Sequence, residues 1–395
     1  MGNANVSHRV ETLAVSSAMD MERAMASTTL PKRIDLQANL LTHAKGATVE
    51  RLLRRVGCHE LCIQGKSSST AAPRRLFEPE VVRAIGHVKQ SRLQKLILKN
   101  LDIQRGDNDH HSGPNRSVDP LECMAHRLSK LTHLEELHLQ SCRIDESILE
   151  DILISIKQLP HLKQVTINLR DHITNRRLRA QLEHVASELV ARPQMTSMAL
   201  SEYPLQSCFW KNVAVSDSLT HLSLALRHDD QLSLLHPHQR QYFWDLLQQN
   251  KSIQQLEFQV AAGVSLTNLQ EMLADNSTVT SLLLHLEEDP THVSQWLSQV
   301  LEYDNFTLEK VHLLCHNLYG YKVRIPNRQI DFYTRLNRNG RRKLVGDDAN
   351  STRSQEWVTA LSQNTYDVSS TYYWLQAHPQ LVTRAIVAAT TTTDN

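Results

Sequence analysis

The sequence predicts an α/β solenoid, a horseshoe with a concave parallel sheet, convex helices and a helical C-terminal cap. Two observations predict this fold. Short apolar segments with a period of two recur along the chain, and the segments between them carry apolar residues at helical spacing. The composition agrees, because leucine makes up about one residue in seven, aromatic residues make up only 5% and glycine only 11 residues. Such a chain is expected to repeat one aliphatic packing unit many times.

The first repeated element is a short strand. Its clearest copy has Leu134, Leu137, Leu139, Cys142 and Ile144 at the repeating positions. Alternate side chains of a strand point to opposite faces, so the leucines are expected to bury one face and leave the other to solvent. Copies recur about every 31 residues, and they start near residues 58, 93, 134, 162, 195, 219, 253, 279 and 308. The longest interval contains a polar segment, residues 104–119, which is predicted to be a surface loop.

The second repeated element is a helix that leads the chain back to the next strand. Apolar residues recur every three or four positions in these return segments, as at residues 81–88, 148–159, 178–189 and 293–300. A strand, a helix and a parallel strand form a right-handed unit. Stacked units are expected to curve, because helices need more width than strands about 4.8 Å apart.

The joints between helix and strand share a short motif. Asn250, Asn276 and Asn305 each stand two residues before Ser or Thr and three before an aliphatic residue that opens a strand. Asparagine tolerates the left-handed conformation that often ends a helix. We therefore expect these residues to be left-handed helix C-caps rather than glycosylation sites.

The strand motif at residues 134–144, followed by helical return segments, resembles the leucine-rich repeat of the ribonuclease-inhibitor-like class. That resemblance implies a solenoid of about eight or nine units over residues 49–322. It implies a fold and no particular activity.

The two ends of the chain lack this repeat. Residues 1–48 are predicted to be a flexible or partly helical lead-in, and residues 49–56 a first capping helix. Residues 323–388 are aromatic-rich and predict a helical C-terminal cap, followed by a disordered tail at 389–395. The pattern within the cap resembles the C-terminal cap of uncharacterised leucine-rich-repeat families of marine diatoms, and it consists of Tyr333, Leu336, Asn337, Arg338, Gly340, Arg341, Trp357, Val358, Tyr373, Trp374 and Leu375.

The sequence carries no motif for an enzyme. It has no nucleophile elbow, Walker loop, dinucleotide-binding glycine pattern, zincin helix or paired CxxC, so we expect neither catalysis nor a cofactor. The histidines at 110, 111, 236 and 238 lie near aspartates in loops that are expected to hold a metal poorly. A basic cluster resembles a nuclear-localisation or nucleic-acid patch, although a solvated helix face explains it better, and it consists of Arg335, Arg338, Arg341, Arg342 and Lys343.

Three features of the sequence indicate the cellular compartment: the net charge, the cysteines and the amino-terminal segment. The net charge of +1 provides no general field for nucleic acid, and no run of 18 apolar residues predicts a membrane span. The six cysteines are scattered, with Cys58 and Cys62 expected on one face of a strand, and they predict reduced thiols. No secretory pattern opens the sequence. The motif for myristoylation of Gly2 has Ser or Thr at the sixth position, where this sequence has Val6. We expect a cytoplasmic protein, with a nuclear location as the alternative.

The solvent-facing strand positions are the candidate binding surface. Extended concave faces of solenoids commonly bind proteins, so we expect a non-enzymatic protein–protein interaction module that uses the concave sheet or the adjoining loops. The alternative is a regulatory adaptor, either a substrate receptor of a ubiquitin ligase or a GTPase-activating type of regulator. The candidate partner-binding residues are Lys95, Lys99, Glu136, His138, Gln140, Gln164, Thr166, Asn168, His221, Gln255, Glu257, Gln259, His285, Lys310 and His312.

Overall fold

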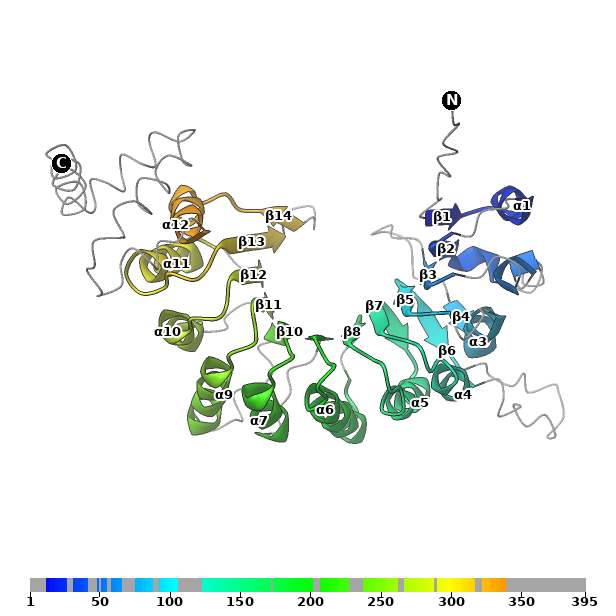
Figure 1. The fold of residues 1–395 in the computed structure, drawn as a ribbon, viewed down its shortest axis with the longest axis horizontal. Coiled ribbons are helices and arrows are strands. Elements are labelled where there is room, and N and C mark those ends of the chain that lie inside the picture. The colour runs from blue at the N-terminus through cyan, green and yellow to red at the C-terminus, as the bar shows by residue number, and fades with distance from the viewer. Residues whose placement is uncertain are drawn as a thin grey trace, which may run out of the picture. The chain divides into compact units, whose positions relative to one another are not determined.

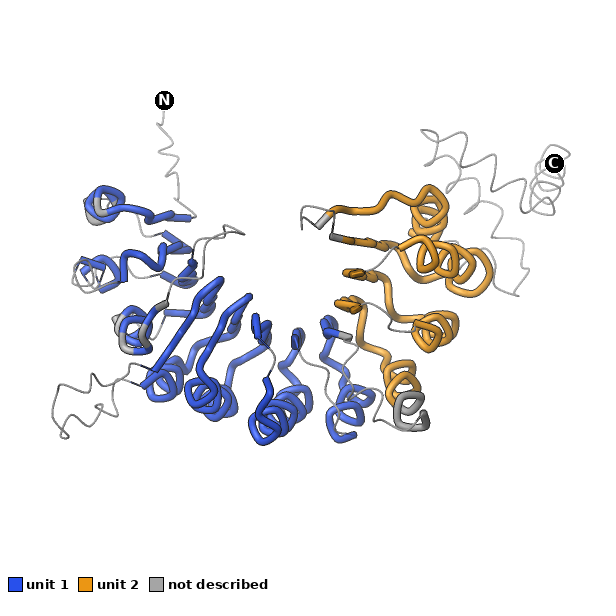
Figure 2. Tube along the Cα trace, turned by 180° about the vertical axis from the view of Figure 1, so that it is seen from behind, with its two compact units in different colours: residues 1–226 blue, residues 227–395 orange. Residues whose placement is uncertain are grey.

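The computed structural model describes most of the chain between residues 12 and 338 (Figure 1). Within that range it does not describe residues 27–30, 42–47, 50, 55–57, 66–74, 88–91, 106–122, 172, 202–206, 227–236, 262–265, 288–289 and 317–321. The chain divides into two compact units, residues 1–226 and 227–395, which are shown separately coloured in Figure 2. In each unit the helices lie on one side of the strands. We call the opposite side the strand face.

Unit 1 is built on a parallel sheet whose strands follow one another in chain order. These strands are β1 (Thr12–Val15), β2 (Arg33–Gln37), β3 (Glu60–Gln64), β5 (Lys95–Lys99), β7 (Glu136–Ile144), β8 (Gln164–Leu169), β9 (Ser197–Leu200) and β10 (His221–Leu226). Two further strands, β4 (Arg75–Phe77) and β6 (Asp102–Gln104), form a second small sheet with the end of β7. The return segments are α1 (Ala18–Ala26), the 3-10 helix η1 (Ala38–Leu40), α3 (Glu78–His87), α4 (Met124–Ser129), α5 (Glu146–Ile156), α6 (Arg176–Val190) and α7 (Ser207–Val215).

Unit 2 continues the same alternation. Its parallel strands are β11 (Gln255–Val260), β12 (Ser281–Leu286) and β13 (Lys310–His316), and a short antiparallel strand, β14 (Lys322–Arg324), pairs with the end of β13. Its helices are α9 (Pro237–Gln249), α10 (Thr267–Asp275), α11 (Thr291–Tyr303) and α12 (Arg328–Arg338). All nine strands predicted from the repeat are present, so the prediction of an α/β leucine-rich-repeat solenoid is confirmed.

Strand register places equivalent aliphatic side chains in columns. Leu61, Leu96, Leu137 and Val165 are consecutive partners across β3, β5, β7 and β8, and all four are fully buried. Burying one such side chain stabilises the fold by about 1.5–3 kcal/mol. A shift of one residue in any strand would turn its column to solvent, so the aliphatic repeat determines the register of the whole sheet.

The predicted lead-in contains part of the sheet. β1 and β2 lie within residues 1–48, and Ile34 and Leu36 of β2 pair with Leu61 and Ile63 of β3. Ile34 and Leu36 are fully buried, so this part of the lead-in is a further repeat strand, beside the helix α1. The physical reason is that β2 covers the edge of β3, which would otherwise expose its apolar column.

Asn276 is the C-cap of α10, as predicted, but the asparagine backbone is not left-handed. Asn276 has φ −78° and ψ 128°, and the described non-glycine residues with positive φ are Asn100 and Ser141. The Oδ1 of Asn276 instead accepts hydrogen bonds from the backbone N–H groups of Thr278 and Val279, at 2.9 and 2.8 Å. The asparagine therefore stabilises the turn into the next strand through its side chain.

The predicted C-terminal cap is only partly described. Within residues 323–388 the structure describes one helix, α12, which begins at Arg328 and ends at Arg338. Residues 339–388 of the cap, and the predicted tail, lie outside the described residues. The predicted surface loop at 104–119 overlaps β6 at Gln104, the last residue of that strand, and residues 106–119 lie outside the described residues. Among the described helices, none has the length and hydropathy needed to cross a membrane.

Candidate functional site

The predicted binding residues of unit 1 lie in three cross-strand rungs on its strand face. The first rung runs through Lys95, Glu136, Gln164, Ser197 and His221. The middle rung runs through Ile97, His138, Thr166, Ala199 and Ser223. The third rung joins Lys99, Gln140 and Asn168. The strand register thus brings together residues from repeats far apart in the sequence.

Four of these side chains form one polar network. The Lys95 ammonium and the His138 Nε2 both contact the same oxygen of Glu136, Oε2, the histidine at 3.2 Å. The other ring nitrogen of His138, Nδ1, is 2.9 Å from the Thr166 hydroxyl. Because the carboxylate can only accept, neutral His138 carries its proton on Nε2, and the Thr166 hydroxyl donates to Nδ1. This network crosses β5, β7 and β8 and holds its members in place.

The network shifts the ionisation of two of its members. Burial lowers the pKa of His138, and the nearby Lys95 lowers it further, whereas Glu136 opposes both effects. Burial alone would raise the pKa of Glu136, but hydrogen bonds from Lys95 and His138 outweigh it and lower that pKa below its usual value. At neutral pH the arrangement is a carboxylate held between a lysine ammonium and a neutral imidazole.

Sequence reasoning missed the continuation of this surface on β2 and β3. Arg33 is the register partner of Glu60, which is the partner of Lys95, so the first rung alternates in charge as far as Glu136. The Arg33 Nε is 2.7 Å from the Asp35 carboxylate. The signal was present in the alternation of charged and aliphatic residues over 33–37, but the segment is short and was included in the lead-in.

The strand face of unit 2 carries a second, smaller set of predicted residues. Gln255 and Lys310 lie in one rung through Ser281, and Glu257 and His312 lie in the next rung through Leu283. Gln259 pairs with His285 in the third rung. The His285 Nε2 contacts the Glu257 carboxylate at 2.9 Å across the rungs, so this pair is the local counterpart of the His138–Glu136 contact.

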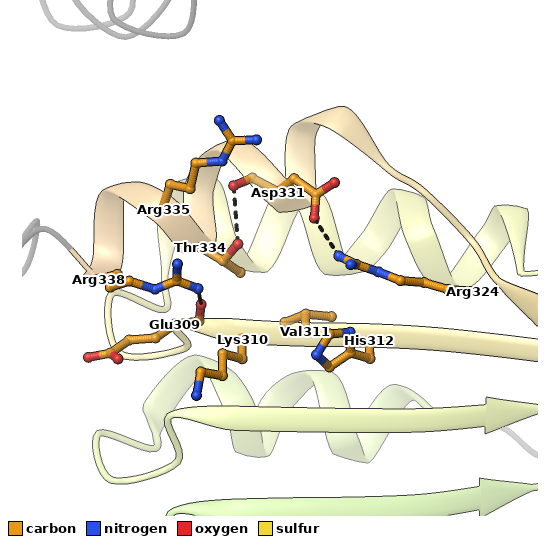
Figure 3. A pocket seen from close by; sticks show the side chains of 9 residues that line it. All are labelled: Glu309, Lys310, Val311, His312, Arg324, Asp331, Thr334, Arg335 and Arg338. Carbon is orange, nitrogen blue, oxygen red and sulfur yellow. Dashed lines mark hydrogen bonds and ion pairs between the residues drawn. The ribbon is translucent and has the colours of Figure 1, made fainter. Parts of the chain in front are cut away.

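A pocket of about 370 Å³ lies at the C-terminal edge of unit 2 (Figure 3). It joins two predicted residues, Lys310 and His312, to side chains on β14 and α12. Arg335 and Arg338 come from the basic cluster, whereas Arg324 was missed because no motif marks it. The full lining is Glu309, Lys310, Val311, His312, Arg324, Asp331, Thr334, Arg335 and Arg338. The remaining basic-cluster residues, 341–343, lie outside the described part of the chain.

The remaining candidates give no site in the described residues. No group of three or more His, Cys, Asp or Glu side chains there could hold a metal ion. The loop histidines at 110, 111 and 236 lie outside the description, and His238 falls in the first turn of α9. None of the six cysteines forms a disulfide. Cys58 precedes β3 and Cys62 lies within it, so the expectation that they share one strand was wrong. Burial raises the pKa of Cys58 to about 12.

Comparisons with known proteins add little beyond this. No family model matches the chain, and no curated protein does. A chain in the crystal structure of a TLR13–ssRNA13 complex matches 71% of this chain at 13% identity and a TM-score of 0.35, and this chain covers 35% of its length. A second match is a chain from the "Octameric complex of Latrophilin 3 (Lec, Olf), Unc5D (Ig, Ig2, TSP1) and FLRT2 (LRR)". The match covers 78% of this chain and 94% of that chain, at 14% identity and a TM-score of 0.29.

The class of this protein therefore follows from its own repeated units. It is an α/β solenoid of leucine-rich repeats with a polar strand face.

Proposed function

We propose that this protein is a non-enzymatic interaction module that binds a partner protein through the strand face of unit 1. The observation that carries the proposal is the network of Lys95, Glu136, His138 and Thr166, which holds polar side chains in fixed positions across three repeats. Stability alone does not require such a network on a face turned away from the helices. A surface that is ordered before binding loses less conformational entropy when a partner docks.

The two faces of the sheet differ in composition. The helix side repeats the same aliphatic residues in every strand, as in the column of Leu61, Leu96 and Leu137. The strand face changes from charged at β2 to β7, through amide and hydroxyl at β8, to small at β9. Repetition on one side serves packing, whereas variation on the other provides a distinct pattern of charge and shape for recognition.

The partner is a protein surface of mixed charge. The first rung alternates from Arg33 to Glu60, Lys95 and Glu136, so a complementary surface must alternate as well. The strand-face rungs of unit 1 contain no Trp, Tyr or Phe, the residues that with Arg supply most binding hot spots. Electrostatic complementarity then governs association, and binding is expected to weaken as the salt concentration rises.

We further infer that the repeats are of the ribonuclease-inhibitor-like class and that the protein works in the cytoplasm. The return segments α5, α6, α9 and α11 are true helices of 11 to 15 residues, as that class has. All six thiols lack a disulfide, which supports a reducing compartment.

The test compares two variants of the full chain as baits for affinity purification from the cells that express it. Gln164→Arg with Asn168→Arg places two long cations on the strand face, at half-buried positions. Gln158→Arg with Gln181→Arg adds the same charge after α5 and on α6, away from that face. We expect proteins retained by the wild type to be lost by the first variant and kept by the second, with the affinity then measured on the purified pair.

Equal retention by all three baits would contradict the proposal. Loss of the retained proteins on both variants would also contradict it, because added charge anywhere on the protein would then be enough to prevent binding. Circular dichroism at increasing temperature establishes that each bait is folded.

A further inference from the structure

We propose that the pocket at the C-terminal edge of unit 2 is an anion site for a phosphate group carried on a side chain of a protein. This inference rests on the proposed role in protein binding, but it concerns unit 2 alone. It is carried by the four cationic side chains from β13, β14 and α12 that line a cavity of about 370 Å³.

Among the described strands, β13 is paired on its outer side over only about half of its length, and the pocket lies beside the other half. β14 pairs with Leu314, Cys315 and His316, so it stops short of the first half of β13. Helix α12 lies beside that first half, and its Arg338 Nη2 donates to the backbone oxygen of Glu309 at 3.0 Å. The cavity lies between the helix and the unpaired half of the strand (Figure 3).

Amphipathic packing of α12 places Arg335 and Arg338 on the side of the helix that lines this cavity. Ile330, Tyr333 and Leu336 are buried against the unit. Asp331, Arg335 and Arg338 recur at intervals of four and three residues, so they share a neighbouring face of the helix. The helix thus anchors its apolar side and presents a charged flank to the strand.

The charges around the cavity do not balance. Among the described lining residues, four cationic side chains, Lys310, Arg324, Arg335 and Arg338, accompany two carboxylates, Glu309 and Asp331, which is a formal excess of two positive charges. Arg324 and Asp331 form an ion pair at 3.0 Å, but their side chains are 52% and 35% exposed. Exposed pairs of this kind are weak, so an incoming anion can compete for the guanidinium.

The donors suit a phosphate group. A guanidinium has five N–H donors in a planar fork that matches phosphate oxygens, and Arg338 uses one nitrogen on the strand. The ammonium of Lys310 is exposed and joins no carboxylate among the described residues. Burial lowers the pKa of His312, as do Arg324 and Lys310, whereas Asp331 opposes them. A dianion would reverse that effect and draw a proton onto the imidazole.

A protein source fits the cavity better than a nucleic acid. None of the nine lining residues is Trp, Tyr or Phe, so the cavity offers no platform for stacking a base. Lys310 and His312 also belong to the strand face of unit 2, so a protein lying on that face could place one modified side chain in the pocket.

The experiment measures binding of three probes to the full chain by calorimetry: acetyl-Ala-phosphoserine-Ala-amide, its unphosphorylated form, and inorganic phosphate. We expect the phosphopeptide to bind, the serine peptide not to bind, and inorganic phosphate to bind more weakly than the phosphopeptide. The His312 imidazole, followed by ¹H–¹⁵N NMR, is expected to show a raised pKa when the phosphopeptide is bound.

Variants locate the site. Lys310→Gln and Arg335→Gln should each weaken phosphopeptide binding about tenfold, because each removes a charge-assisted hydrogen bond to the phosphate. Arg328→Gln, at the exposed start of the same helix and outside the lining, should leave binding unchanged. Lys310→Gln removes no hydrogen bond within the described residues, so it tests the site even if Arg335→Gln perturbs folding.

Several results would overturn the inference. The phosphopeptide could fail to bind, or Arg328→Gln could weaken its binding as much as Lys310→Gln and Arg335→Gln do. Inorganic phosphate could also bind as tightly as the phosphopeptide. A decathymidylate that binds more tightly than the phosphopeptide, and is lost in the same variants, would assign the pocket to nucleic acid instead. The strand-face variant Gln164→Arg with Asn168→Arg should keep full phosphopeptide binding, so failure of the proposed function and failure of this inference are distinguishable.

Discussion

The side chain of Asn305 closes the helix of the preceding repeat. Its Nδ2 donates to the backbone oxygen of Leu273, in α10, at 2.6 Å, and to that of Asn276 at 3.2 Å. Its Oδ1 accepts from the backbone N–H of Leu308 at 2.8 Å, where the next strand begins. One buried amide therefore satisfies backbone groups of two successive repeats, which would otherwise be left without partners.

Replacing Asn305 should destabilise unit 2. Asn305→Ala leaves the Leu273 oxygen and the Leu308 N–H buried and unsatisfied, and each such group costs about 1–3 kcal/mol. We expect a loss of about 3 kcal/mol in the free energy of unfolding by urea, followed by tryptophan fluorescence. Ser277→Ala, in the adjoining motif, is the control and should cost less. A change under about 1 kcal/mol for Asn305→Ala would contradict this role.

Two glycines should respond to alanine in opposite ways. A Cβ at Gly65 would lie 2.1 Å from the backbone oxygen of Asn100, so the chain must move, and we expect a lower melting temperature. At Gly86, in α3, the nearest atoms are 3.2 Å away and belong to the flexible end of Arg127. Alanine favours the helix by about 1 kcal/mol there, so Gly86→Ala should be neutral or stabilising. Equal melting temperatures for the two variants would show that the contact at Asn100 is not tight.

Stability should fall as the pH decreases below about 6.5. The folded state lowers the pKa of His138, so the unfolded chain binds a proton near the ordinary value of 6.5 that the folded chain does not yet bind. Glu136 acts in the same direction at lower pH, because its pKa is also lowered and its favourable interactions disappear on protonation. His138→Gln should reduce the slope of unfolding free energy against pH between about pH 5 and 7. An unchanged slope in that variant would mean that other groups dominate.

Thiol reactivity should separate the buried cysteines from the exposed one. Burial raises the pKa of Cys58 to about 12 and that of Cys142 to about 11, so their thiolates are scarce at pH 8 and reagents cannot reach them. Cys208 is exposed and should react first with a disulfide reagent, and Cys208→Ser should remove that fast phase. Full reaction of Cys58 on the same timescale without denaturant would contradict its burial.

The strength of the period-two pattern decided how much of the strand layout the sequence could predict. Eight strands have three apolar residues in the expected spacing, and a weaker copy around Leu61 completes the nine. β1 and β2 were missed because Ile34 and Leu36 alternate over only five residues, among charged neighbours. A pattern that short does not distinguish a strand from an irregular segment.

Placing a residue on a face is different from knowing what it contacts. The spacing assigned His138 to the face of its strand opposite the buried leucines, and in the structure it is half-buried and lies beside Ile97 of β5. That it bonds both Glu136 and Thr166 depends on side-chain rotamers and on the register with β8, which no local pattern encodes. The asparagine motif was likewise recognised as a joint, but its backbone conformation was predicted wrongly, because the side-chain oxygen of Asn276 stabilises the next turn by accepting from its N–H groups and needs no left-handed backbone.

The amino-acid sequence by itself determined the repeat, its strands and helices, and which side chains face the helices, because each depends on hydrophobic periodicity within one unit. Tertiary structure decided the polar network on unit 1 and the cationic pocket of unit 2. Those depend on strand register and on α12 docking beside the half-paired β13, which bring together residues up to about 40 positions apart.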